Sequence, residues 1–483
     1  MNWLLLGEIF YFIIIILVCL KIVYDTGSST KASAYILLVL LVPLIGIFIY
    51  FSFGINYRKR KMYSKSLFSK DLESRLIGEL KELQEAILVS HSNTLSKYSG
   101  LVNLVSSRDF FPVTTNNEVR LLINGENKFP VVLEKLEHAR HHIHIEYYIF
   151  EPDEIGNQII DLLIKKAKQG IKVRFIYDDF GSQRLRKKQL RKMREAGVEA
   201  FPFYKIKLIA LANSINYRNH RKIVVVDGTT GFIGGINVSD KYINNPVQPG
   251  KLFWRDTHLM IEGPAFNSLQ YIFMVDWNYC SKQQLQPGQS FFPQTGGKVP
   301  GGKLVQIVAS GPDSDTPLIQ QSICKAISLA KKEVLITSPY FIPGETVKDT
   351  IIIAAQSGIE VKLLVPGISD SVFVNMANHS HFSLLLEAGV NIYTYEKGFV
   401  HAKTIVIDEE IAMVGTANMD LRSFDLNFEV NAIAYDNNLA MELRRVFFND
   451  LNDAIEIDAK KWRNRPKYRQ LLDKIVRLVS PLM

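Results

Sequence analysis

The chain opens with two long apolar stretches. Leu4 to Val23 is apolar apart from two charged residues, and Ala34 to Phe53 is twenty residues without a charge. About 20 apolar residues suffice for a helix to cross a bilayer. The sequence therefore predicts two transmembrane helices within residues 1–56. A cleaved signal peptide is the alternative for the first stretch, but that stretch has neither a basic leader nor a small-residue cleavage site.

A basic run, Arg58–Lys61, follows the second apolar stretch at once, whereas the connector Asp25 to Ser33 carries one Asp and one Lys. Positive charge next to membrane helices stays on the cytoplasmic side. We expect a multi-pass protein of a bacterial cell membrane, with both termini and the bulk of the chain in the cytoplasm. The basic run is also suited to binding anionic headgroups.

From Ser66 to Ser92, apolar residues recur every three to five positions with charges between them, which predicts a helix. We assign residues 57–115 to a basic juxtamembrane segment and a helical stalk.

From Val119 onwards, strand-like and helix-like patterns alternate, and short segments recur. Gly170–Arg174 matches Gly358–Lys362, and Glu195–Val198 matches Glu387–Val390, in the same order along the chain. Two homologous α/β halves in tandem are predicted, at 116–293 and 303–483, joined by a Gly-rich linker at 294–302; the second half ends in an amphipathic tail.

The stretch from Glu195 to His220 in the first half is 11 residues longer than the equivalent stretch from Glu387 to His401 in the second half. The insert, around 205–215, contains Lys205–Ala212, which is basic and then apolar. A lid or membrane-dipping segment and a helix packed on the domain are both compatible with it.

A second repeat carries the candidate chemistry. Each half has a His-x-Lys-x4-Asp pattern followed by a small residue and an Asn, and His to Asn is 17 residues in both (237 − 220 and 418 − 401). One such pattern is weak evidence, but two with matching tails are strong evidence. The members are His220, Lys222, Asp227, Gly235 and Asn237, and His401, Lys403, Asp408, Thr416 and Asn418.

Both copies read as β-hairpins. A turn centred on Gly228 and Thr229 would place Asn237 opposite His220 and Gly235 opposite Lys222, and the second copy would pair in the same way. Since alternate strand residues share a face, His, Lys and Asn should converge, with the small residue beside them. The two aspartates fall on the other face, which favours turn or packing roles.

A histidine, a lysine and an amide around one gap suit a tetrahedral anion, because they supply a nucleophile or acid, a point charge and a neutral donor. Duplication gives two histidines facing one phosphate.

Asp256 and Glu429 follow the two motifs and align between the halves. A carboxylate bonded to the far nitrogen of a histidine fixes its tautomer, so we expect these two to support the histidines. A buried ion pair is the alternative.

These motifs are those of the phospholipase D superfamily, and the chain resembles the bacterial cardiolipin synthases over nearly its whole length. The runs Asn216–Lys222, Trp254–His258 and Asn427–Val430 carry the resemblance. It implies two tandem phospholipase D-like α/β sandwich domains with the active site at their interface. It also implies catalytic motifs that include Asp227 and Asp408.

The activity implied is transfer of a phosphatidyl group from one phosphatidylglycerol to another, through a phosphatidyl-histidine on His220, with His401 as acid and base. Lys222, Lys403, Asn237 and Asn418 would neutralise the phosphate oxygens. Since the halves are near equivalents, the sequence itself does not assign the nucleophile. A phospholipase D that hydrolyses, a synthase using phosphatidylethanolamine, and an inactive lipid-binding scaffold stay open.

Charge and cysteine content narrow the partners. The formal net charge of +9 suits an anionic partner, and the membrane segments favour anionic lipid over nucleic acid. Three scattered cysteines support neither a disulfide framework nor a zinc site. The histidines at 138–144 ahead of Glu146 lack further ligands, so we expect no metal. No nucleotide-binding glycine pattern is present, so no cofactor is expected. The oligomeric state is not indicated.

Overall fold

The computed structural model describes residues 3–26, 29–51, 70–107, 111–204, 217–245, 250–293, 302–369 and 372–479. The basic run Arg58–Lys61, the insert at 205–215 and nearly all of the 294–302 linker lie outside these residues.

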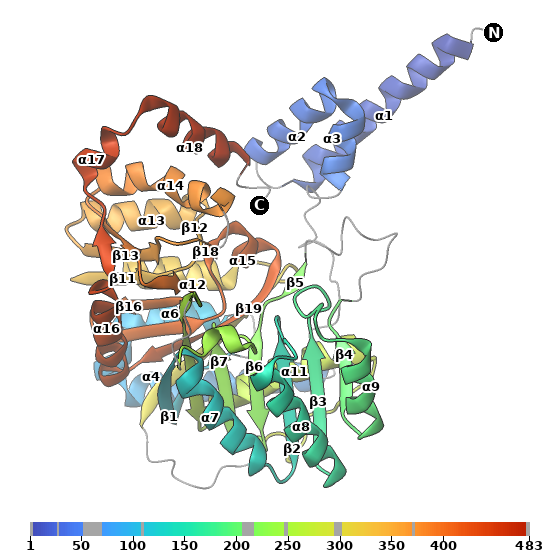
Figure 1. The fold of residues 1–483 in the computed structure, drawn as a ribbon, viewed down its shortest axis with the longest axis vertical. Helices are drawn as coiled ribbons and strands as arrows, with labels where there is room; N and C mark the ends of the chain where they lie inside the picture. Colours follow the sequence, from blue (N-terminus) through green and yellow to red (C-terminus); the bar gives the residue numbers. More distant parts are fainter. Residues whose placement is uncertain are drawn as a thin grey trace.

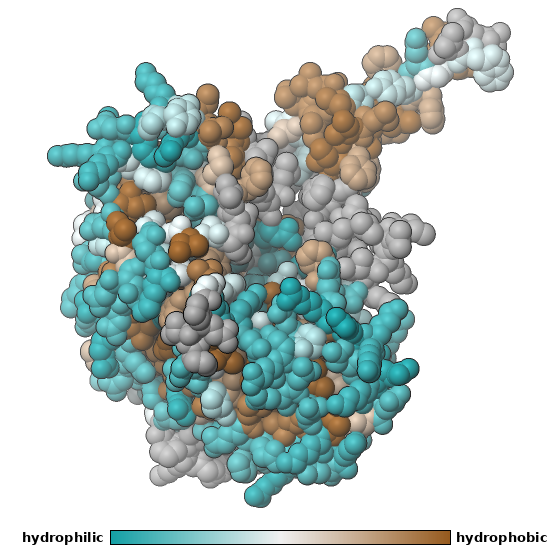
Figure 2. All heavy atoms as spheres, in the orientation of Figure 1, coloured by the Kyte–Doolittle hydropathy of each residue, from teal (hydrophilic) through white to brown (hydrophobic). Residues whose placement is uncertain are grey.

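The N-terminal segment forms one long helix and two short ones. Helix α1 (Trp3–Asp25) projects from the body, followed by α2 (Ser29–Leu41) and α3 (Pro43–Ile49) (Figure 1). Within the described residues, one helix, Leu5–Asp25, is long and apolar enough to cross a membrane. Most of its large apolar side chains are exposed. Figure 2 shows hydrophobic surface gathered where α1 lies beside α2 and α3, with paler and more hydrophilic atoms toward the outer end of α1.

The prediction of a second spanning helix from Ala34 to Phe53 is not confirmed, because Pro43 interrupts it. Proline has no N–H to donate and its ring clashes with the preceding turn; Val42 accordingly leaves the helical conformation, with φ −137°. Gly46 then lies so close to α2 that a Cβ would be 2.6 Å from the Leu38 carbonyl oxygen. Helix α2 alone has 13 residues, about 20 Å of length against a hydrocarbon core of about 30 Å.

The predicted stalk is helical where it is described, and it packs on the second half of the body. It comprises α4 (Lys70–Ser90), α5 (Ser92–Leu95), the 3₁₀ turn η3 (Ser96–Tyr98) and α6 (Ser99–Ser106). Leu101, Val102 and Val105 are buried in the main hydrophobic cluster together with strand residues such as Ile307. The stalk is therefore part of the core.

The body is built on one sheet of sixteen strands in the described part of the chain. Its first half has the order β4-β3-β2-β6-β7-β9-β1, and its second half has the order β10-β19-β17-β16-β11-β13-β14-β20; β1 and β10 pair antiparallel at the centre. The sixteenth strand, β5, lies off this path and pairs with β19. Counted outward from the β1–β10 pair, each strand of the first half has an equivalent strand at the same position in the second half. The prediction of two tandem α/β halves is thus confirmed, and both halves lie in one mixed sheet.

The strands of the first half are β1 (Thr114–Ile123), β2 (His142–Tyr147), β3 (Lys172–Tyr177), β4 (Glu199–Pro202), β5 (Arg218–Asn219), β6 (Lys222–Val226), β7 (Thr230–Gly234), β8 (Phe253–Arg255) and β9 (Thr257–Glu262). Those of the second half are β10 (Lys303–Ser310), β11 (Glu333–Thr337), β12 (Phe341–Ile342), β13 (Glu360–Pro366), β14 (Asn391–Tyr395), β15 (Gly398–Val400), β16 (Thr404–Ile407), β17 (Ile411–Gly415), β18 (Met419–Asp420), β19 (Asn427–Tyr435) and β20 (Ala454–Glu456).

Helices cover both faces of the sheet. The packing of β6 shows this, since its alternate side chains belong to two different hydrophobic clusters. Val224 and Val226 pack with residues of α7 (Asn124–Glu137) and α8 (Glu154–Lys168), whereas Ile223 and Val225 pack with residues of α11 (Phe266–Ser281). The other helices are α9 (Lys187–Glu195), η5 (Asp240–Tyr242), α12 (Leu318–Ser328), α13 (Glu345–Gln356), α14 (Val372–Glu387), α15 (Leu421–Asp425), α16 (Asn437–Leu451), α17 (Ala459–Arg463) and α18 (Lys467–Val479).

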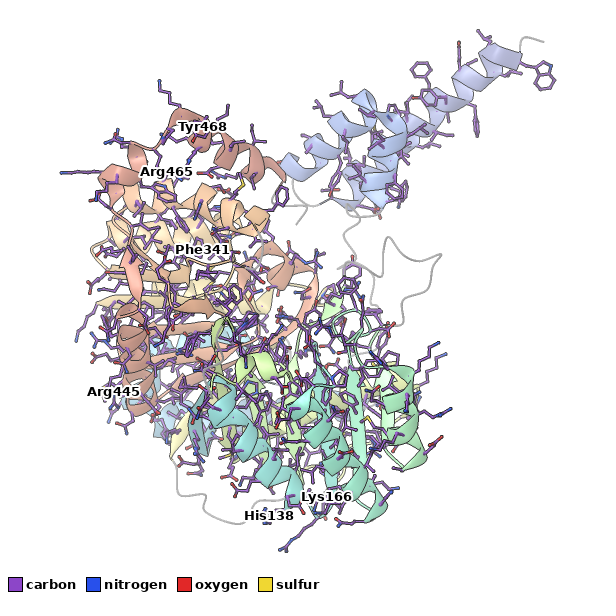
Figure 3. The ribbon with its side chains drawn as sticks, viewed as in Figure 1. His138, Lys166, Phe341, Arg445, Arg465 and Tyr468 are labelled. Carbon is purple, nitrogen blue, oxygen red and sulfur yellow. The ribbon has the colours of Figure 1, made fainter. Side chains whose placement is uncertain are left out.

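The described part of the second half ends in the amphipathic α18, which packs on α14 at the outer end of that half (Figure 1). Val476 is buried, while Tyr468, Leu471, Leu472 and Ile475 are exposed along one face. Figure 3 labels Tyr468 at the outer end of the second half.

Candidate active site

Both predicted hairpins are present, but their register is one residue from the expected one. In the first, Ile223 pairs with Ile233 and Val226 with Thr230, so the turn has three residues, of which Asp227 and Gly228 have positive φ (55° and 62°). The second has the same three-residue turn after Ile407, which pairs with Ile411. The expected pairing of each Asn with its His is therefore wrong. The first turn is centred on Gly228, half a residue before the predicted centre between Gly228 and Thr229, and this moves every cross-strand partner by one residue.

The aspartates of the two motifs hold the far ends of the hairpins. Asp227 accepts backbone N–H bonds from Arg140, His141 and His142 at 2.7–2.9 Å, and Asp408 accepts the equivalent three, from residues 331–333, at 2.7–2.9 Å. Seven extended residues separate His220 from Asp227, about 20 Å. Figure 3 labels His138, just before this amide cluster, at the extreme end of the first half. The structure does not bring these aspartates to the histidines.

Each motif histidine is placed by a strand of the opposite half. Strand β5 pairs with the start of β19, and the His220 N–H donates to the Phe428 carbonyl at 2.9 Å. In the same way β15 pairs with β8, and the His401 N–H donates to the Arg255 carbonyl at 2.7 Å. The residue after each of these carbonyls is a carboxylate, Glu429 or Asp256. The strand pairing thus sets each histidine beside the carboxylate of the other half.

The two histidine–carboxylate contacts are short and buried. His220 Nδ1 lies 2.9 Å from Glu429 Oε1 and 3.0 Å from Oε2, and His401 Nδ1 lies 2.7 Å from Asp256 Oδ2. Both carboxylates are fully buried, and the histidines are 8% and 7% exposed. A carboxylate at Nδ1 favours a proton on that nitrogen and leaves Nε2 as the reactive position.

The motif lysines gather with the histidines in one electropositive centre. Lys222 Nζ donates to the His220 carbonyl at 2.6 Å, and Lys403 Nζ lies 3.0 Å from His401 Nδ1. Burial, together with the charges of Lys403, Lys222 and His220, lowers the pKa of His401 well below its usual value. Residues of both halves therefore act on one another, and the centre lies between the halves.

Burial also shifts the other groups toward neutrality. It lowers the pKa of His220 to about 4 and that of Lys222 to about 7, although Glu429 opposes both shifts. It raises the pKa of Asp256 to about 6 against the attraction of Lys403. Burial would raise the pKa of Glu429 too, but His220 and Lys222 outweigh it, so that this pKa is lowered. A buried anion between the lysines would relieve their mutual repulsion.

The small residues of the motifs contact the carboxylates. A Cβ on Gly235 would lie 2.2 Å from Asp256 Oδ1, so only glycine leaves room for that carboxylate. Thr416, at the equivalent position, donates its hydroxyl to Glu429. These contacts differ from the phosphate-binding role expected of Gly235 and Thr416, and the carboxylate-supporting role is one that sequence reasoning missed.

The motif asparagines are both buried and already hydrogen-bonded. Asn237 Nδ2 donates to the Tyr242 hydroxyl at 2.8 Å, and Asn418 Nδ2 donates to Asp420 Oδ2 at 3.1 Å. Tyr242 in turn lies 5.9 Å, ring to ring, from His401. Asn237 is thus connected through Tyr242 to the surroundings of His401, whereas Asn418 is held by Asp420.

Aromatic side chains line both histidines, and the motif spacing gave no sign of them. Tyr148 lies edge-on to His220, with ring centroids 4.9 Å apart, and Trp254 lies 5.5 Å from His401. Trp254 stands two residues before Asp256, and its place in the run Trp254–His258, which carries the family resemblance, is the signal that could have identified it.

The histidines ahead of Glu146 form a separate hydrogen-bonded chain. Gln270 joins His142 and His144 at 3.2 and 2.9 Å, and burial lowers the pKa of His142 to about 4. In the described part of the chain, no group of three or more His, Cys, Asp or Glu residues could hold a metal ion. The three cysteines are free.

Comparison with known proteins agrees with this architecture. Residues 132–247 and 323–451 match the family described as "Cardiolipin synthase, PLD-like domain". The cardiolipin synthase of Alkalihalophilus pseudofirmus is 39% identical over 97% of this chain and 92% of its own length. The major cardiolipin synthase of Bacillus subtilis is 38% identical over 98% of both chains.

Among solved structures, phosphatidylserine synthase from Haemophilus influenzae superposes with a TM-score of 0.58 at 14% identity, over 81% of this chain and 98% of that one. At this identity the likeness concerns the fold alone. The sequence relatives reach further, since they span nearly the whole chain. The chain belongs to the cardiolipin synthase family of phospholipid-modifying enzymes, with a phospholipase D-like domain in each half.

Proposed function

We propose that this enzyme makes cardiolipin by phosphatidyl transfer between two phosphatidylglycerol molecules, at the centre between the halves. The observation that carries the proposal is the reciprocal pairing of each histidine with a buried carboxylate from the other half. Two histidines, each bonded to a buried carboxylate and close enough for the charge of His220 to lower the pKa of His401, can act on opposite sides of a single phosphorus atom.

In the first step, His220 Nε2 attacks the phosphorus of the donor. The anionic phosphate, once bound, offsets the positive charges that lower the pKa of His401, so that this histidine takes up a proton with the substrate. The bond from phosphorus to the headgroup oxygen then breaks, His401 Nε2 gives its proton to this oxygen, and glycerol leaves. A phosphatidyl group is now bonded to His220. Burial keeps the resting imidazole of His220 neutral at pH 7, as a nucleophile must be, since its pKa is about 4.

In the second step, a headgroup hydroxyl of another phosphatidylglycerol gives its proton to His401 and attacks the same phosphorus. The phosphorus–nitrogen bond breaks and cardiolipin forms. Lys222 and Lys403 balance the charge on the phosphate oxygens throughout, and Asp256 and Glu429 stabilise each imidazole when it becomes positively charged. Atoms balance as two phosphatidylglycerols giving one cardiolipin and one glycerol.

The membrane segment favours lipid over water as the acceptor. An enzyme anchored by α1 meets phospholipid at the high local concentration of the bilayer. We infer that residues 1–51 anchor the chain in a bacterial cell membrane. The run Arg58–Lys61 then favours a cytoplasmic body.

The test uses purified full-length protein in phosphatidylglycerol vesicles, with lipid products and free glycerol measured together. We expect equal amounts of cardiolipin and glycerol, lost in His220→Ala and in His401→Ala. Phosphatidic acid as the main product would make the protein a hydrolase. Cardiolipin formation only when phosphatidylethanolamine is added would change the donor, and no turnover at all would support the scaffold.

A further inference from the structure

The first half carries a buried arginine, Arg218, close to the histidine of its motif. Arg218 lies two residues before His220 and is 3% exposed. Its guanidinium carbon lies 4.5 Å from the centre of the Phe180 ring. Neither terminal nitrogen, Nη1 or Nη2, has a hydrogen-bond partner among the described residues.

The carboxylate of Asp178 attracts Arg218, but it does not hydrogen-bond to the terminal nitrogens of that arginine. Asp178 Oδ1 accepts from the backbone N–H groups of Phe180 and Gly181, at 3.0 and 2.8 Å, and its Oδ2 accepts from that of Asn219 at 3.1 Å. Asp178 therefore supplies opposite charge to Arg218 while its oxygens are bonded to the backbone.

A second arginine approaches from the other half. Burial lowers the pKa of Arg218, Asp178 opposes that shift, and the charge of Arg422 adds to it. Both arginines also act on Tyr148, the residue edge-on to His220. Two cations brought together in a largely buried place repel each other, and a buried donor left unfilled is costly. Both costs are offset when an anion binds.

The catalytic chemistry shared by the two halves does not account for this pair. At the position equivalent to Arg218 the second half has Phe399, which packs on Trp254 with ring centroids 4.9 Å apart and lies 5.7 Å from His401. The histidines, lysines and carboxylates match between the halves, but this position does not. The His220 side therefore carries an additional cationic subsite.

We propose that Arg218 and Arg422 bind a second phosphodiester, that of the acceptor phosphatidylglycerol, while the donor phosphate lies between the histidines. The planar guanidinium fork matches phosphate oxygens. The inference rests on the proposed function, because that reaction alone brings two phosphodiesters to one site. Water and free glycerol carry none, so the subsite selects lipid as the acceptor.

The test separates the two half-reactions with Arg218→Gln in the full-length protein. Cardiolipin formation in phosphatidylglycerol vesicles needs both phosphodiesters, whereas exchange of labelled free glycerol into phosphatidylglycerol needs only the donor. We expect cardiolipin formation to fall about ten- to a hundredfold and the KM for the acceptor lipid to rise, while glycerol exchange falls by less than about threefold. Arg422→Gln should show the same split.

Arg184→Gln is the matched control, because its side chain is 77% exposed and pairs only with Glu151 at the surface among the described residues; it should leave both rates unchanged. An equal fall of the two rates in Arg218→Gln would overturn the proposal, since it would place Arg218 with the donor or in the fold. Unchanged rates would overturn it as well. A wild-type protein that makes no cardiolipin would instead refute the proposed function.

Discussion

Replacing Asp256 with asparagine should stabilise the folded protein at neutral pH and nearly abolish its activity. Burial raises the pKa of this carboxyl to about 6, against about 3.9 in an unfolded chain. A folded pKa above the unfolded one means that the contribution to stability is fully present below pH 4 and is lost as pH rises through 6. The difference of about two pKa units lowers the unfolding free energy of the wild-type protein by about 3 kcal/mol at pH 7, where the buried carboxylate is ionised. The amide of asparagine does not ionise, so the variant does not suffer this loss.

The effect on activity follows from the hydrogen bonds of the same carboxylate. Asp256 Oδ1 accepts from the Thr257 N–H at 2.7 Å, and Oδ2 faces His401 Nδ1. Asparagine has one oxygen, and if that oxygen keeps the backbone bond, its NH2 group faces Nδ1 and forces the proton onto Nε2. The wrong tautomer of a catalytic histidine costs about a thousand- to ten-thousandfold in rate.

The assay is unfolding in detergent between pH 4 and 8, alongside cardiolipin formation. The stability gain of Asp256→Asn over wild type should be near zero at pH 4 and reach its full size above pH 6. Glu429→Gln is the matched variant of opposite sign, because the pKa of Glu429 is lowered and its contribution to stability is present above the unfolded pKa of about 4.3 and lost on acidification. An Asp256→Asn protein that is destabilised at pH 7, or whose gain does not change with pH, would refute this reasoning.

Three further substitutions test fold stability, turnover and membrane binding separately. Asp227→Ala removes three backbone hydrogen bonds, so we expect a loss of about 2–4 kcal/mol in unfolding free energy with unchanged turnover per folded molecule. Gly235→Ala drives a methyl group into Asp256, so turnover should fall at least about tenfold while Thr416→Ser retains most of it. The third change uses a protein from which the residues up to the end of α1 have been removed, so that α18 is left to bind anionic vesicles. In a flotation assay, Leu471→Asp on the exposed face of α18 should weaken this binding, whereas Arg463→Gln, outside that face, should reduce it far less.

The local sequence pattern was enough to predict the strands and helices and to place both motifs on β-hairpins. Four-residue β-branched runs ending at an aspartate gave both hairpins, and the repeated glycine and glutamate segments gave the tandem halves. The helical stalk also followed from the spacing of its leucines. These features depend on neighbours in the chain, and so they can be read from it.

What failed depended on one backbone detail or on contacts between distant segments. Pro43 was counted as apolar, although it ends the helix that hydropathy predicted. The hairpin turn holds three residues because Asp227 adopts positive φ to reach the amides of a loop 85 or more residues away. The exchange of carboxylates between halves arises from β5–β19 and β15–β8 pairing, which no spacing within one half records.

The most direct test of the account is to trap the covalent intermediate. His401→Ala, incubated with a phosphatidyl-p-nitrophenol ester and quenched in base, should carry a phosphatidyl group on the peptide that contains His220, because p-nitrophenolate leaves without the proton that glycerol needs from His401, whereas the second step lacks its base. Glu429→Gln in the same background should lower the yield. An adduct on neither histidine, or one on His401 in the His220→Ala protein alone, would contradict the proposed two-step transfer through His220.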